Sequence, residues 1–236
     1  MNAGHILGVI TARGGSKRLP GKNLLPVNGK PLLAYTCAAA LDSALLTRTI
    51  LSTDDEVIAD VGRSCGVEIP FLRPAQLARD DTPSLDVIAH LLAELEKREH
   101  AVPEIVVLLQ PTSPLRTALH IDDGVRLLQK TGADSVVSVC AIPHALAPDM
   151  AMRIVNGQLE PAPGTAPSSA ETFYGRNGAL YVFRTSAFLR SENRYGVDCR
   201  ALIMSPEDSL DIDSAFDLLL AEKLLRDRVK YERVPR

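Results

Sequence analysis

Apolar, strand-like segments alternate with helical segments along most of this chain, and this alternation restricts its possible folds more than any other feature. Strands separated by helices predict a mainly parallel β-sheet with helices on both faces. Glu104–Leu109 is nearly all aliphatic, as expected for a central strand that is covered on both faces. We therefore expect a three-layer α/β fold. The expected strands are His5–Ala12, Thr49–Thr53, Val67–Leu72, Glu104–Leu109, Asp134–Ile142, Gly178–Arg184 and Ala201–Ser205.

The segments between these strands carry signals that start and stop helices. Thr82 followed by Pro83 indicates a helix start, because threonine caps helices and proline fits the first helical position. Gly66 and Gly132 are typical of helix ends. The expected helices run from Pro31 to Leu46, from Asp54 to Gly66, from Thr82 past Leu95, over Ile121–Leu128 to Gly132, and from Ser214 to about Arg228.

The alternation breaks between Pro143 and Gly175, where the chain is rich in proline and shows little periodicity. This stretch also carries Met150 and Met152, but it has too few apolar residues to build a core of its own. We expect a single domain over residues 1–236, with 143–175 as an inserted arm. Such an arm is expected to pack against a second copy of the chain, giving a two-fold symmetric homodimer.

Composition excludes several classes of partner. Lys and Arg number 26 against 29 Asp and Glu, so the excess of basic residues that is typical of nucleic-acid-binding proteins is missing. No apolar run approaches the roughly 20 residues that span a bilayer, and we expect no membrane association. The four cysteines are widely spaced without a C-x-x-C pair, which excludes the usual zinc spacings and favours a cytoplasmic protein.

The loop Arg13–Asn23, which follows the first expected strand, is the strongest candidate ligand site. It holds four cations, three glycines and a serine in eleven residues. Glycines let backbone N–H groups approach an anion, while Arg and Lys neutralise it, so a triphosphate is the expected ligand. A P-loop is excluded, because Ser16 stands where its first glycine belongs and Asn23 follows the lysine. The dinucleotide fingerprint is also absent, and the alternative is a solvated basic turn.

A second candidate site is Ser209–Asp213 near the carboxyl end. If this segment is extended, Asp211 and Asp213 point the same way and present two hard oxygen ligands to one Mg²⁺. The structural alternative is that Asp213 or Ser214 caps the final helix. Together, a phosphate-binding loop and a carboxylate pair predict Mg²⁺-assisted phosphoryl or nucleotidyl transfer, with Mn²⁺ as a possible substitute.

Further polar segments follow other expected strands. Gln110–Arg116 follows the most buried strand, and Arg73 and the segment Asp80–Ser84 follow the third. Arg176–Tyr181 supplies an arginine, an amide and a phenol that could hold a polar sugar. The structural alternatives are a rigid proline turn in the first case and a packed Tyr181 in the last.

In Ala12–Asn23, Gln110–Arg116, Arg176–Tyr181 and Ser209–Asp213, the chain resembles the acylneuraminate cytidylyltransferases, the CMP-sialic acid synthetases. These motifs come in the family's order and span nearly the whole chain. The first is also similar to that of 3-deoxy-manno-octulosonate cytidylyltransferases. The resemblance implies a Rossmann-like nucleotidyltransferase fold. It also implies an enzyme that joins CTP to a nonulosonic acid, giving a CMP-sugar and pyrophosphate.

The resemblance also implies roles for individual residues. The CTP phosphates would contact Arg13, Ser16 and Lys17, and Lys22 would stabilise charge at the α-phosphate. The nucleoside would contact Asn23, and cytosine and ribose would contact Arg73 and Ser84. Three residues match the sugar pocket, namely Gln110, Asn177 and Tyr181. The carboxylates that would hold Mg²⁺ are Asp211 and Asp213.

Two departures from the family leave the sugar open. Pro143–Asp149 carries no lysine where enzymes for N-acetylneuraminate often have one, and Arg176 stands where proline is often found. Legionaminate, pseudaminate and 3-deoxy-manno-octulosonate are therefore alternative substrates. A nucleotide-binding subunit without activity is the alternative from another class. Intact Lys22, Asp211 and Asp213 argue against it, because a subunit that only binds has no need of all three.

Overall fold

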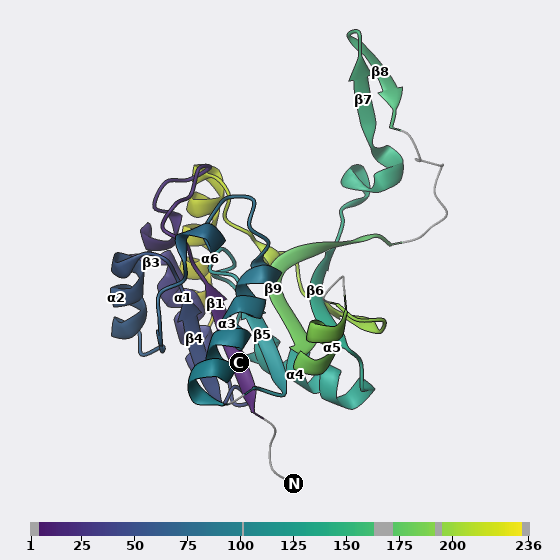
Figure 1. Ribbon diagram of the computed structural model, residues 1–236. Helices are drawn as coiled ribbons and strands as arrows, with labels where there is room; N and C mark the ends of the chain where they lie inside the picture. The colour runs from purple at the N-terminus through teal and green to yellow at the C-terminus, as the bar shows by residue number, and fades with distance from the viewer. Residues whose placement is uncertain (1–4, 101, 163–171, 192–194, 233–236) are drawn as a thin grey trace.

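The fold is built around one six-stranded, mainly parallel sheet with the strand order β10-β6-β9-β5-β1-β4 (Figure 1). The computed structural model describes residues 5–100, 102–162, 172–191 and 195–232. Five strands run in one direction, and β9 alone is antiparallel, between β5 and β6. The predicted mainly parallel sheet is confirmed. The strands are β1 (Ile6–Thr11), β4 (Arg48–Ser52), β5 (Ile105–Leu109), β6 (Ser135–Ala141), β9 (Tyr174–Arg184) and β10 (Cys199–Ile203).

Helices cover both faces of this sheet, as the aliphatic central strands require. Side chains alternate along β5, so that Val107 faces one buried apolar cluster and Val106 and Leu108 face the other. The first cluster lies under α1 (Leu32–Leu41), α2 (Glu56–Ser64) and α4 (Ala118–Thr131). The second lies under α3 (Ser84–Glu99) and α5 (Thr185–Arg190). The molecule therefore has the three layers that the sequence predicted.

The first helix is shorter than predicted, because a distant carboxylate ends it. The sequence predicted a helix to Leu46, but α1 ends at Leu41. The buried side chain of Asp122 on α4 accepts hydrogen bonds from the backbone N–H groups of Ala44 and Leu45. It also accepts one from the hydroxyl of Ser43 at 2.5 Å. These bonds hold the chain in a turn at the point where the periodicity alone would have extended the helix.

The predicted third strand, Val67–Leu72, is wrong. This segment touches β4 through one isolated bridge between Ile50 and Glu68. Pro70 cannot donate to a ladder, and the next backbone bond to the segment that follows β4 is from Arg73 N–H to the Thr53 carbonyl at 2.7 Å. The segment therefore runs beside the sheet without joining it, and it delivers Arg73 to the carboxyl end of β4.

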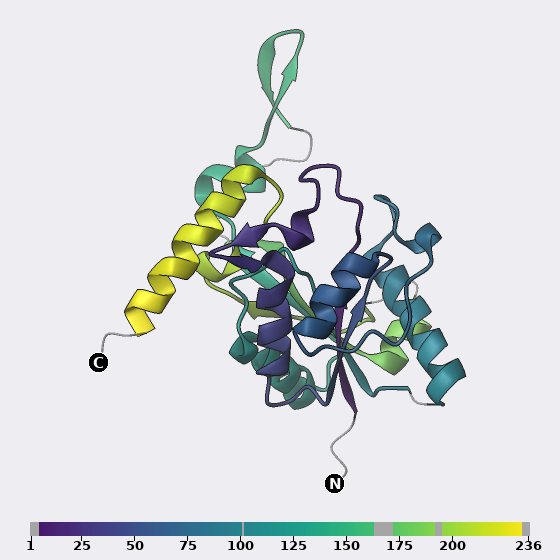
Figure 2. The ribbon, with the colours of Figure 1, turned by 90° about the vertical axis from the view of Figure 1, so that its left-hand side faces the viewer.

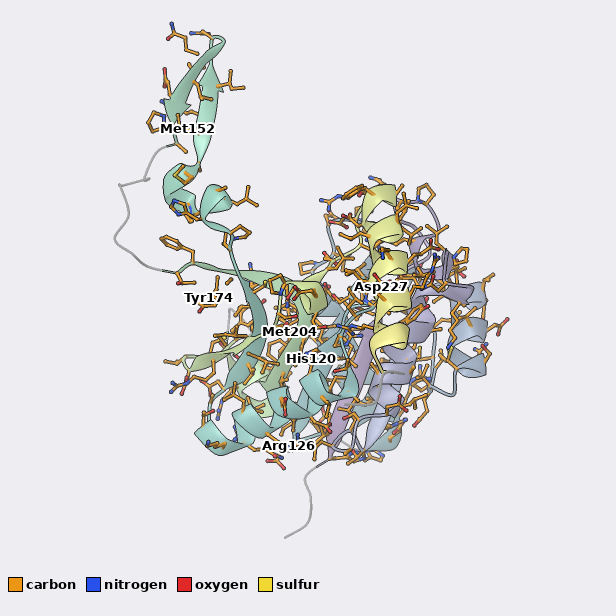
Figure 3. The ribbon with its side chains drawn as sticks, turned by 180° about the vertical axis from the view of Figure 1, so that it is seen from behind. His120, Arg126, Met152, Tyr174, Met204 and Asp227 are labelled. Carbon is orange, nitrogen blue, oxygen red and sulfur yellow. The ribbon has the colours of Figure 1, made fainter. Side chains whose placement is uncertain are left out.

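The inserted segment forms a hairpin that projects from the body (Figures 1 and 3). Its strands are β7 (Met152–Val155) and β8 (Gln158–Pro161), joined by Asn156 and Gly157. Both turn residues have positive φ, 51° and 82°, as expected for an Asn-Gly hairpin turn. Two short 3₁₀ turns, His144–Leu146 and Pro148–Met150, precede β7. Residues 163–171 of the predicted arm lie outside the described residues.

The last helix, α6 (Ala215–Glu232), packs along one side of the body (Figure 2). It lies against the short hairpin of β2 (Pro26–Val27) and β3 (Lys30–Pro31). Ile212 and Ala221 share a small buried cluster with Val27 and Leu32, which fixes the segment just before the helix. Among the described residues, no helix combines the length and the apolar character needed to cross a membrane.

Candidate active site

A cavity of about 290 Å³ opens at the carboxyl ends of β1 and β5. The loop after β1, the turn after β5 and the segment before α6 all reach it, so three segments far apart in the sequence meet there. Most of the predicted nucleotide and metal residues line it, namely Arg13, Ser16, Lys22, Asn23, Arg73, Ser84, Asp211 and Asp213, together with Gln110 of the predicted sugar pocket. The structure therefore brings the predicted site together at the predicted edge of the sheet.

The basic loop is held in place by hydrogen bonds across its base. Asn23, which is buried, donates from Nδ2 to the carbonyl of Arg13 at 3.0 Å and so ties the two ends of the loop together. The N–H of Gly14 donates to Asp54 Oδ1 at 3.2 Å. A side chain at Gly14 would come within 2.5 Å of the Asp55 carboxylate, so the loop can lie this close only with glycine.

Lys22 joins the basic loop to the acidic segment. It lies in the 3₁₀ turn Lys22–Leu24, and its side chain is only 13% exposed. Its Nζ donates to the carbonyl of Ile212 at 2.7 Å and to Asp213 Oδ1 at 3.1 Å. Arg18 donates to the other oxygen of Asp213 at 2.6 Å. Two cations of the loop are therefore aimed at the carboxylate pair.

Asp211 lies at the exposed rim of the cavity, yet the protein around its carboxyl group raises the pKa. Loss of hydration is the main cause, and the charge of Asp213 adds to it. A hydrogen bond from the Thr112 side chain and the charge of Lys22 act in the opposite direction. Asp211 and Asp213 both line the first cavity.

The Asp213 carboxylate does not cap the final helix, α6. Asp217 Oδ2 accepts from the N–H groups of Ser214 and Asp213 at 2.8 and 3.1 Å. In return, the Ser214 hydroxyl accepts from the N–H of Asp217 at 3.3 Å. Ser214 and Asp217 therefore form a reciprocal cap at the start of α6. Both oxygens of Asp213 contact the cations of the basic loop instead.

The carboxylate pair fits a divalent cation that is shared with a substrate. Among the described residues, no group of three or more His, Cys, Asp or Glu side chains is arranged to hold a metal by itself. Magnesium, however, is usually held by one or two carboxylates together with substrate phosphates. Asp211 and Asp213 face the same cavity as the basic loop, so they match that mode of binding.

Arg73 lines the first cavity with a guanidinium whose hydrogen-bonding capacity is only partly used. The residue is 5% exposed, and its Nη2 makes long contacts of 3.4 and 3.5 Å with the Ala12 carbonyl and Asp54. Its buried Nε has no hydrogen-bond partner among the described residues. A buried donor left without a partner carries a free-energy cost, and such donors are rare in native structures.

Lys17 is the predicted catalytic residue that the structure leaves outside the cavity. Its side chain is 86% exposed, and its ammonium pairs with Asp80 Oδ2 at 2.6 Å. Arg13 reaches the other oxygen of Asp80 at 2.5 Å while still lining the cavity. Asp80 therefore bridges the two cations in this structure.

A second, polar cavity of about 490 Å³ adjoins the first. Gln110 and Asp211 line both cavities, so a ligand in one would meet a ligand in the other at these two residues. The second cavity contains all three predicted sugar residues. Its lining is Gln110, Arg176, Asn177, Gly178, Tyr181, Ser209 and Asp211.

Asn177 and Gly178 shape this second cavity. Asn177 is buried, accepts from the Ser138 hydroxyl at 2.6 Å and donates to Ser209 Oγ at 2.9 Å, so its amide fixes the cavity wall. Gly178 has a φ of 75°, and a side chain there would lie 2.8 Å from Gln110 Oε1. Glycine thus lets Gln110 extend across the wall. Tyr181 stacks on Phe183, and burial raises the pKa of its hydroxyl.

Arg116 fixes the walls of both cavities from behind. It is fully buried and donates to the carbonyls of Gln110 at 3.1 Å and Ala179 at 2.7 Å, and to Thr36 Oγ1 at 2.7 Å. Burial lowers the pKa of its guanidinium. These bonds tie the turn after β5 to β9, and they explain why the motif Gln110–Arg116 ends in arginine.

Sequence reasoning missed several residues of the first cavity. Leu77, Arg79 and Val87 line it, as does Thr112. The first three lie in or beside the segment between Arg73 and the start of α3. The sequence predicts that this segment follows a strand over Val67–Leu72. Because that strand is absent from the sheet, the prediction did not reveal how closely the segment passes the basic loop. The neighbouring opposite charges of Arg79 and Asp80 were the sequence signal that this segment could belong to a charged site.

Comparisons with known proteins agree with this arrangement. A cytidylyltransferase family model matches residues 7–190. The CMP-N,N'-diacetyllegionaminic acid synthase of Legionella pneumophila is 36% identical over 94% of this chain and 96% of its own length. The N-acylneuraminate cytidylyltransferase of Escherichia coli is 34% identical over 92% of this chain, which spans 51% of that longer protein.

A solved structure shows the same fold. The CMP:2-keto-3-deoxy-manno-octonic acid synthetase complexed with CTP superposes with a TM-score of 0.70 over 95% of this chain and 99% of its own. At 20% identity, this likeness speaks for the fold alone. The family model and the two relatives carry the assignment further: this chain is an enzyme of the cytidylyltransferase family and belongs with the acylneuraminate cytidylyltransferases.

Proposed function

We propose that this enzyme transfers CMP from CTP to a nonulosonic acid and releases pyrophosphate. The observation that carries the proposal is the pair of adjoining cavities that share Gln110 and Asp211. One is basic and suited to a triphosphate, and the other is polar and suited to a sugar acid. Their junction is where the α-phosphate and the attacking hydroxyl would meet.

For the nucleotide, the support comes from the basic loop and from Arg73. Arg13 and Ser16 line the cavity where phosphates would lie, and Lys22 lines it too while donating to Asp213. Arg73 lines the same cavity, its Nη2 makes only long contacts among the described residues, and cytosine offers acceptors on its base edge. Ser84 lines the same wall and would contact the ribose. The structural neighbour, the octonic acid synthetase, is itself complexed with CTP.

For the sugar, the support comes from the second cavity and from the relatives. Arg176 lines that cavity and supplies a cation for the carboxylate of a 2-keto acid sugar. The relative at 36% identity acts on N,N'-diacetyllegionaminic acid by name, and the one at 34% is named for acylneuraminates. We therefore place a legionaminate-type acid first and N-acetylneuraminate second.

In the proposed reaction, the anomeric hydroxyl oxygen attacks the α-phosphorus of CTP. The new bond joins this oxygen to phosphorus, the bond from the α-phosphorus to the bridging oxygen of the β-phosphate breaks, and the hydroxyl proton passes to water. Arg13, Lys17 and Lys22 offset the charge on the phosphates and on the leaving pyrophosphate. Asp211 and Asp213 would hold Mg²⁺, or Mn²⁺ in its place. When bound, this ion would neutralise phosphate charge and orient the triphosphate.

The sugar assignment can be tested with CTP and three acids: N,N'-diacetyllegionaminate, N-acetylneuraminate and 3-deoxy-manno-octulosonate. We expect kcat/KM to be highest for one of the two nonulosonates and at least about tenfold lower for the octulosonate, whose shorter chain leaves polar groups of the second cavity unpaired. The product should have the mass of the CMP-sugar. Equal turnover of the octulosonate would contradict the nonulosonate assignment.

We also propose that the enzyme works as a homodimer in the cytoplasm. The arm carries apolar side chains that are largely exposed within the described part of the chain: Leu146 is 74% exposed, Ile154 76% and Leu159 66%. It leaves the body beside Tyr174, at the start of the strand that carries Arg176 and Asn177 (Figure 3). A partner copy covering the arm would therefore lie next to the second cavity.

Light scattering at micromolar concentration is expected to give twice the chain mass of 25.5 kDa. Replacing Ile154 and Leu159 by Glu should lower the mass toward that of one chain and weaken sugar binding more than CTP binding. Gln158→Glu, at an exposed polar position of the same hairpin, is the control for added negative charge. A single-chain mass for the unaltered protein would refute the dimer.

A further inference from the structure

Asp80 forms ion pairs with Arg13 and Lys17, the first two cations of the basic loop. Its Oδ1 pairs with Arg13 Nη1 at 2.5 Å and its Oδ2 with Lys17 Nζ at 2.6 Å, so each oxygen takes one cation. These hydrogen bonds, from Lys17 foremost and then Arg13, lower the pKa of Asp80. The carboxylate is therefore charged throughout the neutral range. It is an anion seated on the residues that would receive the substrate's phosphates.

The pairing also explains where Lys17 lies. Lys17 is not among the residues that line the first cavity, whereas Arg13 and Asp80 are. Its ammonium contacts Asp80 while the side chain is 86% exposed. A triphosphate in the cavity would compete with Asp80 for this ammonium.

We propose that Asp80 is a resident counter-ion of the basic loop, which holds Arg13 and Lys17 while the site is empty and is replaced by the phosphates of the nucleotide. The proposal deepens the proposed function and rests on it for the identity of the nucleotide. It has two consequences: Asp80 weakens triphosphate binding, and it takes the cations back when pyrophosphate leaves.

The exchange has a small free-energy cost in this structure. The side chains of Arg13 and Asp80 are about a third exposed, 31% and 34%, and ion pairs in contact with water contribute little to stability. A triphosphate brings several charges and more acceptor oxygens than one carboxylate. A triphosphate should therefore displace Asp80 from the two cations, although displacing it weakens the net binding.

The test measures the Kd of inorganic tripolyphosphate by calorimetry at fixed ionic strength for the unaltered protein, Asp80→Asn and Asp81→Asn. Asp81→Asn is the matched control: it makes the same change of charge one residue away, and no ion pair of Asp81 is found within the described residues. We expect Asp80→Asn to bind about threefold to tenfold more tightly, as loss of two surface ion pairs allows. Asp81→Asn should stay within about twofold of the unaltered protein.

A second variant shows whether the effect passes through Lys17. In a Lys17→Met background, the gain from Asp80→Asn should shrink, because one of the two competing pairs is already gone. An undiminished gain would overturn the proposal. So would unchanged or weaker tripolyphosphate binding in Asp80→Asn.

Tripolyphosphate carries neither base nor sugar, so this test is separate from that of the proposed function. Tighter tripolyphosphate binding in Asp80→Asn, without turnover of CTP, would uphold the counter-ion role and reject the reaction. Turnover of CTP with no gain in binding would do the reverse.

Discussion

Replacing Asp211 or Asp213 by Asn is expected to lower turnover at least about a hundredfold while leaving the fold intact. A hundredfold loss corresponds to roughly 2.7 kcal/mol of transition-state stabilisation. Asn keeps the shape of the side chain but removes a charge from a hard-oxygen site, so a bound Mg²⁺ would be weakened severely. The cap of α6 is formed by Asp217 and Ser214, and neither oxygen of Asp213 takes part in it. The stability of the helix should therefore hardly change.

Asp217→Asn is the matched control for this pair. It lies four residues from Asp213 and makes the capping contacts, so it should cost about 1 kcal/mol of stability or less and keep its turnover. EDTA should silence the unaltered enzyme, and Mg²⁺ or Mn²⁺ should restore it. If both Asp211→Asn and Asp213→Asn turned over almost normally at saturating Mg²⁺, the pair would hold no metal.

The layers of the fold could be predicted because they follow from burial along single strands. The aliphatic run Ile105–Leu109 is buried on both faces, and such a strand has to lie between two layers of helices. The direction of β9 could not be predicted in this way. It follows the arm rather than a helix, so nothing in its own residues says that it runs antiparallel between β5 and β6.

The errors lie where a distant residue decides a local structure. The end of α1 is set by Asp122 from another helix, and no local signal in residues 31–46 reports it. Val67–Leu72 has the composition of a strand, but Pro70 prevents continuous pairing. The hairpin of the arm is a different case. Asn156-Gly157 is a turn signal that can be read from the sequence, although it lies in a segment dominated by prolines.

The site could be located from the sequence because parallel strands bring their following loops to one edge. That argument places Arg13 and Gln110 near each other, and they line one cavity. Arg73 lines it too, but it follows a segment that touches β4 only through an isolated bridge. It says nothing about which side chains already have partners. The pairing of Lys17 with Asp80 and the burial of Asn177 among hydroxyl groups arise from contacts between separate loops.

Discrimination between bases is the second large effect expected. Arg73 lines the cavity with a guanidinium whose Nη2 makes only long contacts, so an acceptor on the correct base would pair with it and a base without that edge would not. Sites built on hydrogen bonds reject such analogues strongly. We therefore expect kcat/KM for CTP to exceed that for ATP or GTP by at least about a thousandfold. Arg73→Met should reduce this ratio more than it reduces tripolyphosphate binding.

Pyrophosphate release tests the central claim most directly. CTP, UTP, ATP and GTP would each be supplied at the same concentration below KM, with Mg²⁺, and with or without a nonulosonic acid. Because the two cavities meet at Gln110 and Asp211, we expect pyrophosphate to be released only when CTP and the sugar acid are present together. The amount of pyrophosphate should equal the amount of CMP-sugar formed. Comparable release from ATP, or release from CTP without any sugar acid, would contradict the account.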